Sequence, residues 1–273
     1  VIILLEYTLS LLLLSLDDCI KELIKAELSI VVFSKVNGYK ESLADILNEK
    51  VTDLSMDLDN DKNNGLTSLG IVVAETMRKL AEADIAITNG GGIREPLTKG
   101  DLTVGDLYTI LPFDNTLYTM DLKGADIIKA LEHGIMPGNM GWGQFSGVKV
   151  WYDEAAEAGS RITSVRFMDG TLLDKDAYYK VVVNDFMASG GDGYDFSNAK
   201  NMYDTNIVMR EGIRNDWKAN GVNTDFENLL IKGIDDTIEE DKNEDKGTDK
   251  DKDTDKENGK GDLPNTGEEG FKG

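Results

Sequence analysis

Histidine and cysteine are nearly absent from this 273-residue sequence: each occurs once, as His133 and Cys19. A single cysteine excludes an internal disulfide and a zinc site built from several thiolates. A single histidine excludes a hydrolytic centre that holds two metal ions through several imidazoles, because zinc and manganese need grouped ligands. We therefore predict no catalytic residue and no metal ligand in this chain. His133 is expected to be a surface or packing residue of a helix.

Basic residues are also scarce. Lysine and arginine total 29 against 51 aspartate and glutamate residues, which gives a formal net charge of -22. Nucleic-acid binding depends on basic patches that neutralise phosphates, so this composition argues against it. The acidic balance suits a secreted or surface protein. Hydrophobic residues make up 40% of the chain, enough for the core of one large domain with an appendage or of two small domains.

A long apolar run is missing as well. The leucine-rich segment 1–16 is broken by Glu6 and is shorter than the roughly twenty apolar residues that a membrane helix needs, so we predict no membrane span. It lacks the basic start and small-residue cleavage site of a signal peptide. A strand or helix cut from a larger domain and a misassembled start are the alternatives. Residues 1–35 are left unassigned.

Apolar patterns predict one folded domain over residues 36–234. Helical spacing covers residues 39–51, 66–83 and 124–134, and Thr103 is a suitable N-cap for a further helix. β-Branched and aromatic residues predict strands at 84–88, 117–122, 148–152, 162–167 and 178–183. A turn is expected at 168–171. Helices and strands are mixed without strict alternation, so the predicted class is α+β.

Two glycine-rich turns are the most informative segments. The first, NGGGIR, occupies residues 89–94, and the second, NDFMASGGDG, occupies residues 184–193. Consecutive glycines allow positive φ angles and close approach of a ligand. Arg94 offers a planar fork of donors to a phosphate or ribose, and Asp192 offers an acceptor to sugar hydroxyls. Either turn alone is compatible with an ordinary surface turn, but the two together predict a nucleotide site.

Further motifs give the chain a family resemblance. Between the two turns lie EPL at 95–97, LPFDNT at 111–116 and QFSGVKVWYD at 144–153. In this order and spacing the sequence, from about residue 36 to 221, resembles the C-terminal domain of the 5'-nucleotidase family. In that family a separate N-terminal metallophosphatase domain holds the metals. The resemblance therefore implies no cofactor in this chain and divalent metal ions in a catalytic domain outside it.

The resemblance also assigns the contacts to a nucleobase. Phe113 and Phe186 match the two rings that sandwich the base, and aromatic faces stack on any base at roughly 1–3 kcal/mol. Asn89 and Asn115 match asparagines on the base side. The alternative for both rings is burial in the core, which is the usual fate of phenylalanine.

The ribose and phosphate contacts follow in the same way. Asp192 matches the acid that holds the ribose hydroxyls, Arg94 matches the arginine that reaches phosphate and ribose, and the matching glycines let the loop approach the ligand. The complete predicted substrate-binding set is Asn89, Gly91, Gly92, Arg94, Phe113, Asn115, Phe186 and Asp192. One family arginine is missing near Asn63, where Lys62 would supply a point charge without the bidentate fork.

The composition changes after Ile234. Residues 235–262 are almost entirely Asp, Glu, Lys, Asn, Gly and Thr, which predicts a solvated, extended spacer. The next residues match the LPxTG motif that sortase cleaves to join a protein to peptidoglycan: Leu263, Pro264, Asn265, Thr266 and Gly267. We therefore expect an extracellular protein on the cell wall of a Gram-positive bacterium, with sortase and peptidoglycan as partners. Complete sorting signals continue with an apolar span and basic residues, so a chain ending at Gly273 is expected to anchor poorly.

Three functional hypotheses follow. The first is the substrate-binding domain of a surface-anchored 5'-nucleotidase-type phosphoesterase, which hydrolyses extracellular nucleotides to nucleoside and phosphate. This chain would then recognise base and ribose without supplying the metal centre. The second is a non-catalytic cell-wall protein that binds nucleotides or is adhesive. The third is a structural surface domain without a ligand, in which changing Phe113 or Arg94 alters no binding.

Overall fold

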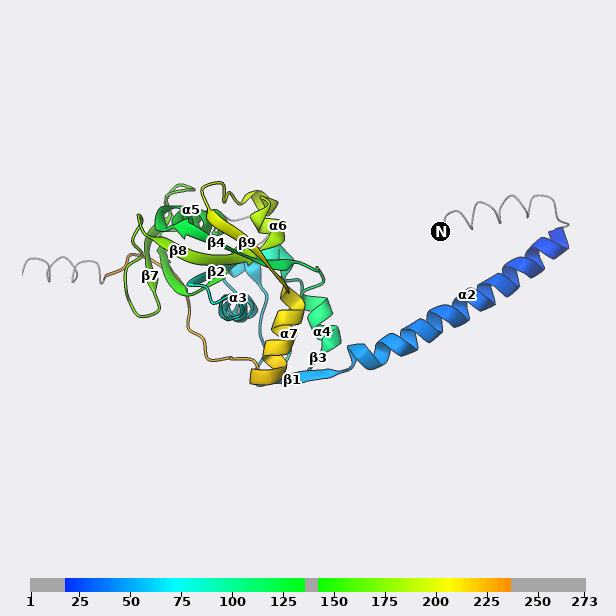
Figure 1. Cartoon of the computed structure of the whole chain (residues 1–273). Helices are drawn as coiled ribbons and strands as arrows, with labels where there is room; N and C mark the ends of the chain where they lie inside the picture. The colour runs from blue at the N-terminus through cyan, green and yellow to red at the C-terminus, as the bar shows by residue number, and fades with distance from the viewer. Residues whose placement is uncertain (1–17, 136–141, 237–273) are drawn as a thin grey trace, which may run out of the picture. The chain divides into compact units, whose positions relative to one another are not determined.

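A five-stranded mixed sheet lies at the centre of the fold (Figure 1). The computed structural model describes residues 18–135 and 142–236. The strands, in their spatial order, are β5 (Gln144–Ser146), β2 (Ile85–Thr88), β8 (Tyr178–Asn184), β4 (Thr116–Lys123) and β9 (Lys200–Val208). β2 pairs with β8 in parallel, and the other neighbouring strands pair antiparallel. The two parallel strands both lead directly into the predicted glycine-rich turns.

The remaining strands form two smaller sheets. One has the order β10-β6-β7 and consists of β10 (Leu230–Lys232), β6 (Val148–Tyr152) and β7 (Ile162–Phe167). The other pairs β1 (Lys50–Leu54) with β3 (Gly100–Thr103) in antiparallel register. The predicted turn after β7 is present: the Phe167 carbonyl accepts from the Gly170 N–H at 3.0 Å, and Gly170 has a φ of 90°.

The central sheet separates two hydrophobic cores. Side chains alternate along a strand, and accordingly Val182 of β8 packs in one core while Val181 and Val183 pack in the other. The first core includes residues of α3, α4 and α7, and the second includes residues of α5, β6 and β7. The helices are α3 (Ser68–Leu80), α4 (Val104–Ile110), α5 (Gly124–Gly134), α6 (Asp185–Ala188) and α7 (Met209–Asn220).

Helix capping explains two of the helix starts. Thr67 accepts a hydrogen bond from the Gly70 N–H, so α3 begins at Ser68, two residues after the predicted start. Thr103 and Asp106 form a reciprocal capping box at the start of α4, which confirms the predicted N-cap. Trp217 of α7 is buried and donates from Nε1 to Thr76 Oγ1 of α3 at 3.0 Å, which fastens the two helices together.

The predicted helix at 39–51 needs a correction. Helix α2 spans Asp18–Leu47, so it includes part of the unassigned N-terminal segment, and residues 50–51 belong to β1. Val51 and Leu54 are buried members of that strand, and a short strand of this kind is hard to distinguish from a helix by apolar spacing alone.

The α+β class is confirmed by this mixture of sheets and helices. Within the described part of the chain, the helices are too short or too polar to cross a lipid bilayer. The compact unit ends at Ile234. Segment 1–16, most of the predicted spacer and the sorting motif at 263–267 lie outside the described residues.

Candidate functional site

The first glycine turn is a tight extension of a buried strand. All four residues of β2 are buried, and the chain then forms one turn of 3-10 helix, η2 (Gly90–Gly92). Ile93 is fully buried, and the Arg94 N–H donates to the Ile110 carbonyl at 2.9 Å. A Cβ on Gly92 would lie 3.1 Å from Asn89 Oδ1, so a larger residue would crowd the Asn89 amide.

Lys62 holds this turn through hydrogen bonds to its backbone. Its ammonium donates to the Gly90 carbonyl at 2.9 Å and to the Ile93 carbonyl at 2.5 Å. Burial, followed by repulsion from Arg94, holds the pKa of Lys62 below its ordinary value. These hydrogen bonds show that Lys62 positions the turn. The sequence predicted a different role, a point charge for the phosphate.

The second glycine turn depends on left-handed backbone. Asn184 caps α6 by accepting from the Met187 N–H at 2.8 Å. The following turn includes η3 (Gly191–Gly193), and Gly190, Asp192 and Gly193 have φ angles of 88°, 53° and 79°. A residue other than glycine is strained in this region, so the conformation of Asp192 requires support from its surroundings.

His133 provides part of that support. Its Nε2 lies 2.8 Å from the Asp192 carbonyl oxygen, and its ring packs edge-on against Tyr194 with centroids 4.6 Å apart. Burial, with a further contribution from the Asp192 carboxylate, raises the pKa of Tyr194. His133 is therefore a packing residue on α5, as predicted, and it also contacts the turn that carries Asp192. Among the described residues, no cluster of three or more His, Cys, Asp or Glu side chains is arranged to hold a metal ion.

Side-chain amides connect the two turns. Asn89 Nδ2 donates to Asp192 Oδ2 at 2.7 Å, and Asn184 Nδ2 donates to Asn89 Oδ1 at 2.8 Å. Asn89 and Asn184 are both buried. This chain of hydrogen bonds fixes the Asp192 carboxylate relative to the first turn, although Asn89 and Asp192 are 103 positions apart.

A third loop, between α4 and β4, carries Phe113 and Asn115. Arg210 of α7 is almost fully buried and donates to the carbonyl oxygens of Leu111 at 2.8 Å and Phe113 at 3.3 Å. The same guanidinium pairs with Asp114. Its Cζ also lies 3.8 Å from the centroid of the Tyr108 ring. This role of Arg210 has no signal in the sequence, because its contacts join residues nearly a hundred positions apart and no motif surrounds it.

The three loops enclose one cavity of about 210 Å³, which we call the glycine-turn cavity. Its lining residues are Asn89, Gly91, Gly92, Arg94, Phe113, Asn115, Phe186 and Asp192. These are all eight members of the predicted substrate-binding set. Phe113 is 51% exposed and Phe186 is 46% exposed, so the alternative that both rings belong to the core is wrong.

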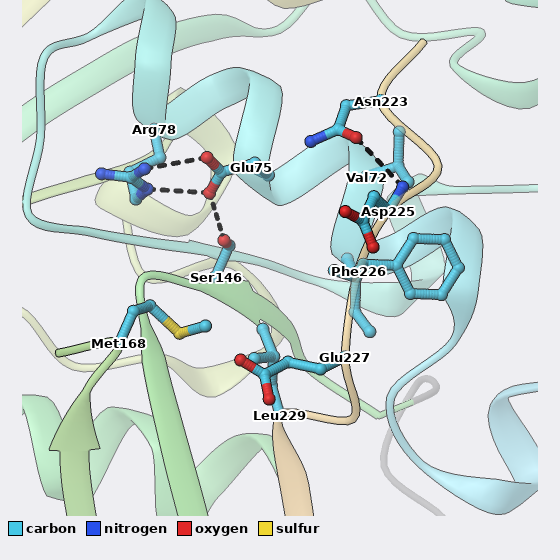
Figure 2. A pocket seen from close by; sticks show the side chains of 11 residues that line it. Val72, Glu75, Arg78, Ser146, Met168, Asn223, Asp225, Phe226, Glu227 and Leu229 are labelled. Carbon is cyan, nitrogen blue, oxygen red and sulfur yellow. Dashed lines mark hydrogen bonds and ion pairs between the residues drawn. The ribbon is translucent and has the colours of Figure 1, made fainter. Parts of the chain in front are cut away.

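A second cavity, of about 360 Å³, lies between α3, β5 and the segment after α7 (Figure 2). We call it the α3 cavity; its polar lining includes Glu75, Arg78 and Ser146. Glu75 accepts from Arg78 Nε and Nη2, both at 2.8 Å, and from Ser146 Oγ at 2.5 Å. Burial opposes ionisation of Glu75, but these donors outweigh it and lower its pKa. These three groups pair with one another, so they offer few polar contacts to a ligand; Asn223, Asp225 and Glu227 also line the cavity.

Comparison with known proteins assigns most of the folded domain to one family. Residues 47–199 match the family model described as "5'-nucleotidase, C-terminal domain". The chain is 36% identical over 192 residues to the trifunctional nucleotide phosphoesterase protein YfkN of Bacillus subtilis, covering 65% of this chain and 13% of the relative. It is 31% identical over 175 residues to the cell wall protein Lmo0130 of Listeria monocytogenes, covering 59% of this chain and 22% of the relative.

A solved structure is similar to this chain in both fold and sequence. The 5'-nucleotidase precursor from Thermus thermophilus superposes with a TM-score of 0.66 and 32% identity, over 74% of this chain and 43% of that protein. The chain thus spans less than half the length of each of these relatives.

Proposed function

Because the chain belongs to the family of 5'-nucleotidase C-terminal domains, we propose that it is the substrate-binding part of a phosphoesterase that hydrolyses extracellular nucleotides to nucleoside and phosphate. In this role it recognises base and ribose, and an N-terminal metallophosphatase domain with divalent metal ions performs the hydrolysis. The observation that carries the proposal is the glycine-turn cavity, where eight residues from three distant loops meet.

The base occupies the part of the cavity next to Phe113 and Phe186. Each ring leaves about half of its surface exposed, and an exposed phenyl face next to a cavity is favourable for stacking a planar base. Stacking requires no particular hydrogen-bonding pattern, so these two rings bind purines and pyrimidines alike. Base preference must come from polar groups at the edge of the cavity.

The ribose lies against Asp192. Asp192 Oδ2 already accepts a hydrogen bond from Asn89 Nδ2, whereas no residue in the described ranges donates to Oδ1. A carboxylate oxygen of this kind accepts from a sugar hydroxyl, and charge-assisted hydrogen bonds of this type are stronger than neutral ones. Its orientation is set before the ligand arrives, which reduces the entropy lost on binding.

The phosphate extends toward Arg94. Arg94 Nη1 donates to the Gly91 carbonyl at 3.1 Å, which leaves other donors of the guanidinium available. Lys62 adds positive charge close by, since the two cations are near enough to repel each other. Contacts to base and ribose then hold the scissile phosphate in place, so that remote binding energy lowers the barrier at the metal centre.

A titration tests this function. Adenosine and AMP are added to the isotope-labelled chain, and NMR shifts are followed to several millimolar. We expect saturable shifts with a Kd near 1 mM, about -4 kcal/mol, and loss of those shifts in Phe113→Ala. Met168→Ala is the matched control, because Met168 is 47% exposed and lines the α3 cavity instead. Absence of saturable shifts in the unaltered chain would contradict the proposal.

One observation favours a second candidate, a non-catalytic wall protein that binds nucleosides. The family arginine near Asn63 is absent, and Lys62 is occupied by two backbone carbonyls. Phosphate then contributes little to binding. In this case AMP binds no more tightly than adenosine, whereas a substrate-binding domain of a nucleotidase gains affinity from the phosphate.

Anchoring to the cell wall of a Gram-positive bacterium is a separate part of the proposal. It is supported by the LPxTG sequence at Leu263–Gly267 and by the similarity to a protein named as a cell wall protein. Sortase and peptidoglycan are the partners. Incubation with a sortase and a glycine nucleophile is expected to join the nucleophile to Thr266, and Thr266→Ala is expected to abolish the reaction.

A further inference from the structure

One hydrogen bond beside the glycine-turn cavity sets the orientation of the Asn115 amide. Asn115 Nδ2 donates to Asp185 Oδ1 at 2.6 Å, and the same oxygen accepts from the Phe186 N–H at 2.9 Å. An ionised carboxylate only accepts hydrogen bonds. The amide must therefore turn its NH₂ group, and not its oxygen, toward Asp185.

The backbone around this amide is held firmly. The Asn115 carbonyl accepts from the Met209 N–H at 2.8 Å, and Arg210 grips the same loop two residues earlier through Phe113. A side chain that is fixed at both its backbone and its amide nitrogen presents its remaining atoms in one direction.

The carbonyl oxygen of that amide is available to a ligand. No described residue donates to Asn115 Oδ1, and Asn115 lines the cavity whereas Asp185 does not. Phe113 and Phe186 line the same cavity. A base that stacks on these rings therefore brings its edge to an acceptor, with the second N–H of the Asn115 amide next to it.

Bases differ in what they offer to such an acceptor. Adenine carries an amino group beside the ring acceptor N7, a pattern that asparagine binds in bidentate fashion, and cytosine also carries an exocyclic amino group. Hypoxanthine and uracil carry an oxygen in the corresponding place. An oxygen facing Asn115 Oδ1 leaves two acceptors opposed, and burying an unpaired acceptor is costly.

We propose that Asp185 is a specificity-determining residue: by orienting Asn115, it makes the site prefer nucleosides with an exocyclic amino group over their oxo counterparts. This inference rests on the proposed nucleoside site and deepens it. Asp185 touches no ligand in this arrangement, because it acts through the Asn115 amide. An asparagine at position 185 can donate or accept, so it would let the Asn115 amide flip.

The test compares two nucleoside pairs on the full chain. NMR titrations measure the Kd of adenosine against inosine and of cytidine against uridine, for the unaltered chain, Asp185→Asn and Asn115→Ala. We expect the amino member of each pair to bind about tenfold more tightly in the unaltered chain. In both variants the ratio is expected to fall to about twofold or less. Both members of a pair stack alike, so a purely structural loss would weaken them equally and leave the ratio unchanged.

The outcomes separate this inference from the function beneath it. Equal binding of adenosine and inosine by the unaltered chain overturns the specificity and leaves the nucleoside site intact. An unchanged ratio in Asp185→Asn also overturns it. Binding of neither nucleoside overturns the proposed function together with this inference. If Asp185→Asn fails to fold, the ratio in Asn115→Ala decides, because that variant removes the acceptor itself.

Discussion

The α3 cavity and the glycine-turn cavity differ in how the polar atoms of their lining are used. In the larger α3 cavity, Glu75, Arg78 and Ser146 bind one another and offer little to a ligand. In the smaller glycine-turn cavity, the neighbours that fix Arg94, Asn115 and Asp192 leave part of the hydrogen-bonding capacity of these side chains free. A binding site is therefore recognised by available, pre-oriented groups and exposed aromatic faces, and volume alone is a poor guide.

The largest expected effect is a loss of nucleoside affinity when an aromatic ring of the glycine-turn cavity is removed and the fold is left intact. Phe186→Ala is expected to weaken adenosine binding by about 1–3 kcal/mol, because a stacking face is lost. The unfolding midpoint should stay nearly the same, since the ring is 46% exposed and such surface changes cost about 0.5 kcal/mol or less. NMR titration and thermal unfolding measure the two quantities. A large loss of stability with intact binding would reverse the assignment.

The opposite result is expected in the α3 cavity. Glu75→Ala removes the shared partner of Arg78 and Ser146, and should lower the free energy of unfolding by about 1–2 kcal/mol. Nucleoside affinity should not change. Denaturant unfolding and the same titration check both points. Weaker nucleoside binding in this variant would mean that the two cavities are coupled.

His133 tests a third kind of position, because it contacts the turn that carries Asp192 without lining the glycine-turn cavity. His133→Phe keeps a ring against Tyr194 but loses the hydrogen bond to the Asp192 carbonyl. Nucleoside affinity is expected to fall by about 1 kcal/mol, the net value of one hydrogen bond. His133→Gln can still donate to that carbonyl, so partial recovery in this variant is expected. Equal affinities in all three proteins would remove His133 from any positioning role.

The smallest effect is the part of the pH dependence of stability that comes from Glu75 in the α3 cavity. Burial raises the pKa of Glu75, but hydrogen bonds from Arg78 and Ser146 outweigh it and hold the folded-state pKa below the ordinary value of 4.5. This stabilisation is therefore complete above pH 4.5 and is lost as the pH falls through the folded-state pKa. We expect a loss of less than about 1 kcal/mol. Unfolding curves of Glu75→Gln should lack this component; an identical pH profile in the variant would contradict it.

The residues that line the site could be predicted from local motifs, whereas the residues that hold them in place through long-range contacts could not. The eight lining residues lie in glycine turns and in a short loop whose chemistry can be read from neighbouring residues. Their supports come from elsewhere: Lys62 on η1 (Lys62–Asn64), His133 on α5 and Arg210 on α7. None of these roles has a sequence signature, because each depends on the carbonyl oxygen that the fold brings within reach.

The same distinction explains the errors in the predicted fold. Helix α5 and strands β6 and β7 have the predicted bounds, because the glycines at both ends of α5, the alternating burial along β6 and the turn after β7 are local signals. Residues 50–51, which the apolar spacing placed in a helix, begin strand β1, since the identity of this strand depends on pairing with β3 about fifty residues later. Strand β9 was not predicted, because its residues are exposed or half-buried and show no alternation.

The half-exposed rings of Phe113 and Phe186 have a calorimetric consequence. A base that covers them removes apolar surface from water, so binding is expected to carry a negative heat-capacity change. The enthalpy of binding should then become steadily more favourable on warming, while the entropy compensates and the affinity changes little. Replacing either ring by alanine should flatten this temperature dependence. The slope of enthalpy against temperature would thus report how much aromatic surface the ligand covers.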